Sequence, residues 1–303
     1  MWKPSVFVTE CMDKPNVTET VRKTGLVESL RIFEEPPQRA PAQPAPSVIP
    51  ADQVIELSAT ALDSYLTCPL SYRFSRVVKI PVPMHHSQVF GVAVHEALKA
   101  YHLCRREGRK FSADDLLEAF KNAWRSEGFV SREHEDKRFS EGKKLLKEYF
   151  KKEEQSPSKP ALVEEDFRIT MNQVRLRGRW DRVDMSESGS AIIDYKTGEV
   201  KDQKDADKKA RDSAQLSLYA VAFEGRFGKM PDRMELHFLK HGIIGTTSPD
   251  PKKVDTVLAK VQAAAVGVAQ QKFDPTPGYH CRWCPYEKIC PAENKGGLHV
   301  PSI

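Results

Sequence analysis

Long apolar runs are missing from this 303-residue sequence, and so is a secretory leader. No stretch of about 18 consecutive apolar residues occurs, so the sequence predicts no transmembrane helix. The first residues, MWKPSVFVTE, lack a basic region followed by an apolar core, which argues against a signal peptide. We therefore expect a cytoplasmic protein without a membrane partner.

Cysteine is also scarce, with six residues in the whole chain. Six are too few for a disulfide scaffold of this size. In a reducing compartment, thiols that cluster in the sequence favour metal binding over disulfide formation. The sequence positions of Cys281, Cys284 and Cys290 form such a cluster, whereas Cys11 and Cys104 look structural or incidental.

A strong charge of one sign is absent as well, because 47 Lys and Arg residues face 42 Asp and Glu residues, for a net charge of +5. The basic excess is local: residues 137–152 hold seven Lys or Arg residues and two Glu residues. At helical spacing Lys144, Lys147 and Lys151 share one face, which could follow a phosphate backbone. A solvated helix face is the more ordinary interpretation of such a charge run.

Proline marks the organisation of the chain. Residues 34–50, EEPPQRAPAQPAPSVIP, have the composition of a semi-rigid linker. We therefore divide the chain into an N-terminal appendage with its Pro/Ala-rich linker, residues 1–50, and a folded domain, residues 51–303. The first helix of that domain should begin after Ser58 or Thr60, either of which can cap it.

Hydrophobic periodicity changes along the domain from helical to alternating and back. The 40% apolar fraction is sufficient for a folded core. We expect helices at 88–106, 114–127, 139–154, 212–227 and 252–271, and strands at 161–171, 174–185, 190–198 and 234–242. The order of these elements predicts an α/β fold, with a mixed central sheet flanked by helices and a mainly helical N-terminal part.

The segment AIIDYKTG contains the first chemically suggestive pattern. Residues i and i+2 of a strand point to the same face, so Asp194 and Lys196 should be presented together. Asp181, on the preceding strand, should lie close by if the two strands form a hairpin. Two carboxylates suit Mg²⁺ or Mn²⁺, beside which a lysine can orient an attacking water. Taken alone, the Asp-x-Lys triplet is equally compatible with an ordinary surface salt bridge.

The joint order of five segments is more specific: GVAVHEALKAY, GRWDRVD, IIDYKTG, QLSLY and CRWCPYEKIC. As a set, they make residues 56–292 resemble the RecB-like branch of the PD-(D/E)XK nucleases. That branch includes AddB-type and CRISPR-adaptation members with an iron–sulfur cluster. The resemblance implies a restriction-endonuclease-like core and assigns roles to individual residues. His95, Asp181 and Asp194 would be metal ligands, and Lys196 would be the catalytic lysine.

The same resemblance covers two further positions. Gln215 and Tyr219 match a Q-x-x-x-Y helix, whose spacing puts the amide and the phenol on one face near the catalytic centre and the DNA backbone. A further acidic residue often precedes the GR-x-D motif, and Glu164 and Glu165 compete for that place. We favour Glu164.

Cys281 and Cys284 have the x2 spacing that lets one turn offer two thiolates to a metal, and Cys290 follows after five residues. Cys68 is the natural fourth ligand, because both it and Cys290 precede a proline. The resemblance pairs one N-terminal cysteine with three C-terminal ones around a [4Fe-4S] cluster. Zinc in the same site, or four unliganded thiols, are the alternatives.

The segment WKPSVFVTE resembles the closing part of UvrD-type helicases, where a linked nuclease domain follows. No GKT or GKS phosphate loop is present to bind ATP, so this chain would be the nuclease portion of a helicase–nuclease or would work beside a separate helicase.

We therefore predict a metal-dependent DNA nuclease, in particular an exonuclease that acts on single-stranded ends in repair or recombination. Two other functions are compatible with parts of the pattern. One is a catalytically silent iron–sulfur module that binds DNA beside a helicase, and the other is a zinc-stabilised RNA-processing nuclease.

Overall fold

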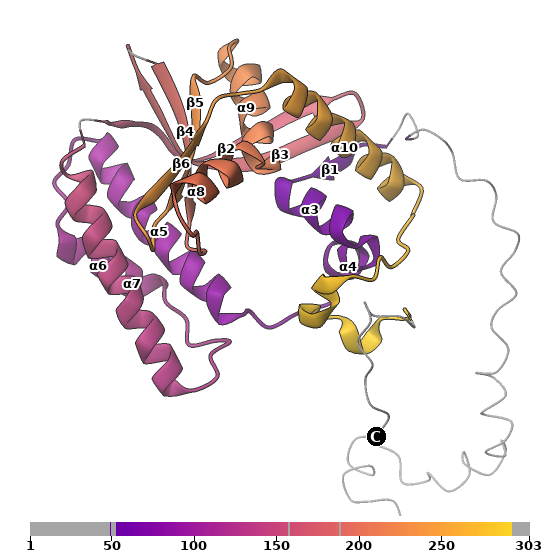
Figure 1. Ribbon diagram of the computed structural model, residues 1–303, viewed down its shortest axis with the longest axis horizontal. Helices are drawn as coiled ribbons and strands as arrows, with labels where there is room; N and C mark the ends of the chain where they lie inside the picture. Colours follow the sequence, from indigo (N-terminus) through magenta and orange to yellow (C-terminus); the bar gives the residue numbers. More distant parts are fainter. Residues whose placement is uncertain (1–48, 50–52, 157, 188, 293–303) are drawn as a thin grey trace, which may run out of the picture. The chain divides into compact units, whose positions relative to one another are not determined.

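The computed structural model describes residues 49, 53–156, 158–187 and 189–292 (Figure 1). Within these ranges, one mixed six-stranded sheet forms the centre of the fold and helices cover its faces. Five strands follow one another in the order β1 (Ile55–Leu57), β3 (Val174–Ser186), β4 (Gly189–Lys196), β5 (Arg233–Phe238) and β6 (Ile243–Thr247), and β2 (Pro160–Met171) pairs with β3. This arrangement confirms the predicted α/β class with a mixed central sheet.

The long strand β3 organises the site because it pairs along both of its edges. The antiparallel partner β2 follows one edge along almost its whole length. The other edge is shared: β1 pairs in parallel with residues 174–176, and β4 pairs antiparallel with residues 182–186. Residues 177–181 of that edge lie between the two partners, so the sheet opens beside Asp181.

Strand β4 is buried on both faces, which explains its continuous apolar sequence. Ile193 and Tyr195 pack against three helices that lie side by side, α5 (His86–Arg106), α6 (Ala113–Ala123) and α7 (Arg132–Glu153). Ile192 packs in the opposite cluster, with α8 (Gln203–Arg211) and α9 (Ala214–Phe227). The alternation of a strand therefore sends Asp194 and Lys196 to one face and Tyr195 to the other.

A third apolar cluster joins β1 to α3 (Ala59–Thr67) and α10 (Pro251–Ala269). The shortest helices among the described residues are α4 (Pro69–Tyr72), η1 (Arg73–Val77), η2 (Tyr279–Trp283) and η3 (Glu287–Ile289). Ser58 caps α3 by accepting a hydrogen bond from the backbone N–H of Ala61, so of the two predicted caps Ser58 is the one used.

Several boundaries differ from those that the sequence predicts. Helix α7 begins at Arg132 rather than at residue 139, because Ser131 caps it through the N–H of His134 and two glutamates occupy its first turn. Helix α8 was not predicted, since its sequence, QKDADKKAR, buries only Ala206 and Ala210. The short strands β1 and β6 were not predicted either. Strand β1 pairs with β3, which is distant in the sequence, and β6 pairs with the preceding strand β5.

Among the helices that the structure describes, none is both long and apolar enough to cross a membrane. The predicted appendage and linker, residues 1–50, lie outside the described residues except for Ile49. That domain boundary therefore stays a prediction.

Candidate metal centre

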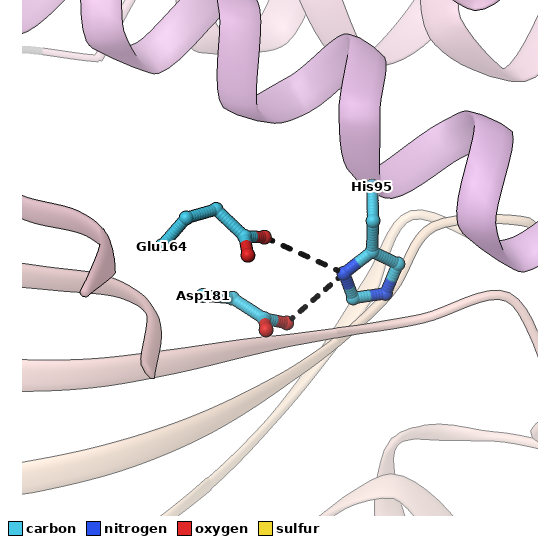
Figure 2. Close-up of side chains that lie close together, drawn as sticks. All are labelled: His95, Glu164 and Asp181. Atoms are coloured by element: carbon cyan, nitrogen blue, oxygen red, sulfur yellow. Dashed lines mark ion pairs between the residues drawn. The ribbon is translucent and has the colours of Figure 1, made fainter. Parts of the chain in front are cut away.

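Three side chains from three different elements meet where the sheet opens. His95 of α5, Glu164 of β2 and Asp181 of β3 place one nitrogen and two carboxylate oxygens within 4.8 Å of one another. His95 Nδ1 lies 3.5 Å from Asp181 Oδ2 and 3.9 Å from Glu164 Oε1, and Figure 2 shows both carboxylates directed at this nitrogen. One imidazole nitrogen and two carboxylates are a donor set that a divalent cation accepts.

Glu164 reaches this group through an unusual backbone conformation. The residues on either side of it pair with the residues on either side of Asp181, so the two acidic residues stand opposite each other. Glu164 has a φ of 49°, in the left-handed region, which costs about 1–3 kcal/mol for a residue other than glycine. Such strain is concentrated at functional sites, and here it accompanies the approach of the carboxylate to His95. Glu165 instead forms an ion pair with Arg226, 3.0 Å away.

His95 is oriented by its second ring nitrogen. Nε2 lies 3.1 Å from the carbonyl oxygen of Tyr195, which can accept a hydrogen bond only from Nε2–H. A neutral His95 must therefore keep its lone pair on Nδ1, the nitrogen that faces the two carboxylates. Burial disfavours its charged form, but contact with Glu164 and the charges of Asp181 and Asp194 prevail and raise the pKa of His95 to about 9. A carbonyl that fixes the outer ring nitrogen is typical of metal-binding histidines.

Asp181 is a buried carboxylate that lies close to other carboxylates. Burial and then the nearby Asp194 carboxylate raise its pKa to about 7. The backbone N–H of Tyr195 donates a 2.8 Å hydrogen bond to Asp181 Oδ2 and partly offsets this effect. Buried carboxylates that repel one another in this way are stabilised by a bound cation.

The other sequence-predicted residues form a connected group beside these three. The side chain of Asp194 is only 2% exposed, and its Oδ2 lies 2.6 Å from Lys196 Nζ. Its other oxygen, Oδ1, accepts a 2.8 Å hydrogen bond from Gln215 Nε2. Lys196 Nζ donates to Gln215 Oε1 at 2.9 Å, and Gln215 Nε2 also donates to the Tyr219 hydroxyl at 2.6 Å. Gln215 therefore ties the Asp-x-Lys strand to α9. Burial, followed by the charges of Asp194 and Asp181, raises the pKa of Tyr219, so its hydroxyl stays protonated.

The structure thus brings together the residues that the sequence proposed for the metal and catalytic centre, with one change of emphasis. The three atoms that lie closest together belong to His95, Glu164 and Asp181, whereas Asp194 makes its shortest contacts with Lys196 and Gln215. The contribution of the Tyr195 backbone was not predicted, because a main-chain contact leaves no signature in the identity of the side chain.

The basic stripe of Lys144, Lys147 and Lys151 is exposed on α7.

The four predicted cysteines also come together. They line one small cavity, although Cys68 lies at the α3–α4 junction and the others in the C-terminal loop. The lining cysteines are Cys68, Cys281, Cys284 and Cys290, and all four are free thiols. Burial and then the other three thiols raise the pKa of Cys284. His280 lines the same cavity, and its buried Nε2 has no hydrogen-bond partner among the described residues. Four free thiols around one cavity are a donor set that a soft metal accepts.

Comparison with known proteins identifies the family of this chain. Residues 56–291 match the model of the PD-(D/E)XK nuclease superfamily, and the chain belongs to this superfamily. A curated relative, the Gene 69 protein of Mycobacterium phage D29, is 20% identical over 270 residues, which are 77% of this chain and 96% of the phage protein. A solved structure, a "Putative exonuclease" from Eubacterium rectale, has 13% identity and a TM-score of 0.48, and the match covers 79% of this chain and 90% of that one.

Family membership makes the chain a nuclease, a hydrolase that acts on nucleic acid. Divalent metal ions are the typical cofactors of this superfamily, and the group of His95, Glu164 and Asp181 fits such an ion in both donor type and spacing.

Proposed function

We propose that this protein is a Mg²⁺- or Mn²⁺-dependent deoxyribonuclease that acts as an exonuclease on single-stranded ends. The observation that supports this function best is the meeting of two groups at one point of the sheet. A ligand group, His95 with Glu164 and Asp181, stands beside a buried carboxylate–lysine pair, Asp194 with Lys196. A nuclease needs both, because phosphodiester hydrolysis requires charge stabilisation and an oriented water.

In this mechanism His95, Asp181 and Asp194 hold the metal, and Glu164 supplies a further carboxylate. When bound, a divalent cation supplies positive charge to the phosphate oxygens and lowers the pKa of coordinated water. The chain's own residues do the rest. Tyr195 fixes the ligand nitrogen of His95 through its carbonyl and one oxygen of Asp181 through its N–H. The site is thus preorganised before substrate arrives.

Lys196 is the residue that acts on water in this proposal. Its side chain is 34% exposed, and its ammonium group is held between Asp194 and Gln215. From that position it can orient the attacking water and neutralise the charge that develops on the phosphate. In-line attack releases the 3′ oxygen and leaves a 5′ phosphate. Gln215 and Tyr219 position the lysine and its carboxylate partner.

We further propose that Cys68, Cys281, Cys284 and Cys290 hold a [4Fe-4S] cluster, as the resemblance to the RecB-like branch implies. The four thiols are free and line one cavity, which supports a shared metal group. Zinc is the alternative occupant, and the metal content of the purified protein separates the two.

The cellular role that we propose is DNA repair or recombination in the cytoplasm, together with a helicase that is either linked to this domain or separate. This part rests on the resemblance of WKPSVFVTE to the closing segment of UvrD-type helicases and on the missing ATP-binding loop in the sequence. That segment lies outside the described residues.

The decisive experiment uses the purified full chain with end-labelled single- and double-stranded DNA, in Mg²⁺, Mn²⁺ or EDTA. We expect single-stranded substrate to be shortened from its ends in either metal and to remain intact in EDTA. The Asp194→Asn variant is the matched control for a contaminating nuclease. Binding of DNA without metal-dependent cleavage would instead identify a catalytically silent module, and preferential cleavage of RNA would overturn the substrate assignment.

A further inference from the structure

Two aromatic side chains are exposed, although they touch each other, on the loop that carries Cys281, Cys284 and Cys290. We call residues 279–290 the cysteine loop. Tyr279 and Trp283, on η2, are 68% and 66% exposed. Their ring centroids lie 4.7 Å apart in an edge-to-face arrangement. The guanidinium of Arg282 lies 4.8 Å from the centroid of the Tyr279 ring. The loop thus presents two ring surfaces and a cation to solvent at one place.

This arrangement is not explained by packing. Tyr286, seven residues after Tyr279, is 7% exposed and packs edge-on against Phe74 at 5.4 Å, so the loop already has a buried aromatic anchor. Cys281 and Cys284, which flank Arg282 and Trp283 in the sequence, line the cysteine cavity. Two large aromatic rings that lie together in water are typical of a binding surface.

The same loop also borders the metal centre. A groove of about 780 Å³ has His95 and Glu164 in its lining together with Pro285 and Tyr286, the residues that directly follow Cys284. The rest of its lining is mixed. Ser64, Ser71, Ser75 and Gln88 offer polar groups to phosphates or bases, Glu96 is acidic, and Val82, Pro83, Met84 and Val92 are apolar. The groove therefore runs from the proposed ligands to Pro285, two residues after Trp283, while Tyr279, Arg282 and Trp283 lie outside its lining.

Exposed cations are concentrated at this end of the groove, where Glu287 is the acidic side chain of the cysteine loop. Arg73, Arg76 and Lys79 are exposed on and just after η1, the helix whose Phe74 packs on Tyr286. Arg282 and Lys288 are exposed on the cysteine loop itself. Cations of this density attract a polyanion, whereas a neutral apolar partner would gain little from them.

We propose that Tyr279, Trp283 and Arg282 form a base-stacking platform that holds the single strand of DNA leading to the metal centre. Exposed aromatic rings bind unpaired bases of any sequence, because every base has a π face, and an arginine adds stacking and charge. Bases in a duplex are already stacked on each other, so the platform selects single strands. This inference rests on the proposed nuclease function and adds the place where the substrate is held.

The test measures binding separately from cleavage. Full-length protein carrying Asp194→Asn, which leaves DNA uncut, is titrated against a fluorescein-labelled oligothymidylate and against a labelled duplex of equal length. In this background, Tyr279→Ala with Trp283→Ala is compared with Tyr279→Phe with Trp283→Phe. Val130→Ala is the control for loss of an exposed apolar side chain, since Val130 is 89% exposed on the loop before α7. Iron content and melting temperature of each variant report whether the loop still folds.

We expect the double alanine variant to weaken single-strand binding by about 5- to 100-fold, with duplex binding changed much less, because stacking acts on unpaired bases. The double phenylalanine variant and Val130→Ala should stay within about threefold of the parent. Arg282→Ala should reduce the salt dependence of single-strand binding by about the equivalent of one phosphate contact.

Equal single-strand affinity of the double alanine variant and the parent overturns the platform, and so does an equal loss for single strand and duplex. A surface that serves a protein partner would give the first of these results. The nuclease proposal fails by a different observation, the absence of metal-dependent cleavage by the wild-type chain. The two failures are therefore distinguishable.

Discussion

The backbone of Tyr195 holds Asp181 by a 2.8 Å hydrogen bond from its N–H to Oδ2. Its carbonyl oxygen, 3.1 Å from Nε2, orients His95. The residue between Asp194 and Lys196 thus fixes two proposed ligands that come from other elements. Its own side chain points to the opposite face of the sheet, where the hydroxyl lies 2.9 Å from His102 Nε2 and 3.0 Å from the Tyr149 hydroxyl.

The Asp-x-Lys pair provides the first prediction. Asp194→Asn and Lys196→Ala should each reduce DNA cleavage by at least about a thousandfold, because they remove a ligand charge and the group that orients water. Cleavage of end-labelled single-stranded DNA measures the loss, and circular dichroism with a binding titration checks that fold and DNA affinity are kept. Full activity of either variant would contradict the assignment.

Glu164 and Glu165 offer a matched pair for the metal site. Glu164→Gln should raise the Mn²⁺ concentration needed for half-maximal cleavage by roughly tenfold or more, since a carboxylate near the cation is lost. Glu165→Gln should leave that concentration almost unchanged, because Glu165 forms an exposed ion pair with Arg226. A larger effect from Glu165 than from Glu164 would reverse the assignment of the acidic ligand.

The hydrogen bonds of the Tyr195 hydroxyl can be tested without changing a proposed metal ligand. Tyr195→Phe removes a buried hydroxyl that contacts His102 and Tyr149, which should lower the free energy of unfolding by about 1–3 kcal/mol. The backbone contacts to Asp181 and His95 remain, so kcat of the folded protein should change by less than about fivefold. Urea denaturation and steady-state cleavage measure the two quantities. Tyr149→Phe, in the same network but outside β4, should show a comparable loss of stability.

The cysteine cavity gives the last prediction. Cys68→Ser should abolish the [4Fe-4S] cluster, so that anaerobically purified protein loses its broad absorption near 400 nm and its content of about four irons per chain. Cys104→Ser is the control, because Cys104 lies on α5, outside the cavity, and should keep the iron. A colourless wild-type protein with about one zinc per chain would replace the cluster with zinc.

Local sequence was sufficient for the parts of the site that lie on a single element. The two-residue period of a strand places Asp194 and Lys196 on one face, and the helical period places Gln215 and Tyr219 on one face. The structure joins these two pairs by hydrogen bonds. The mixed sheet also followed from the alternation of apolar residues, because burial against helices is a property that each strand carries in its own sequence.

The tertiary structure decided the contacts between elements. Residues 164 and 165 are both glutamate and have nearly the same sequence context. The left-handed backbone of Glu164 decides which of the two faces His95. The three-residue strand β1 exists because β3 offers it a free edge, and the polar helix α8 is fixed by its packing on β6. Periodicity determines which side chains share a face. Which faces meet depends on long-range packing and main-chain hydrogen bonds, which no single segment encodes.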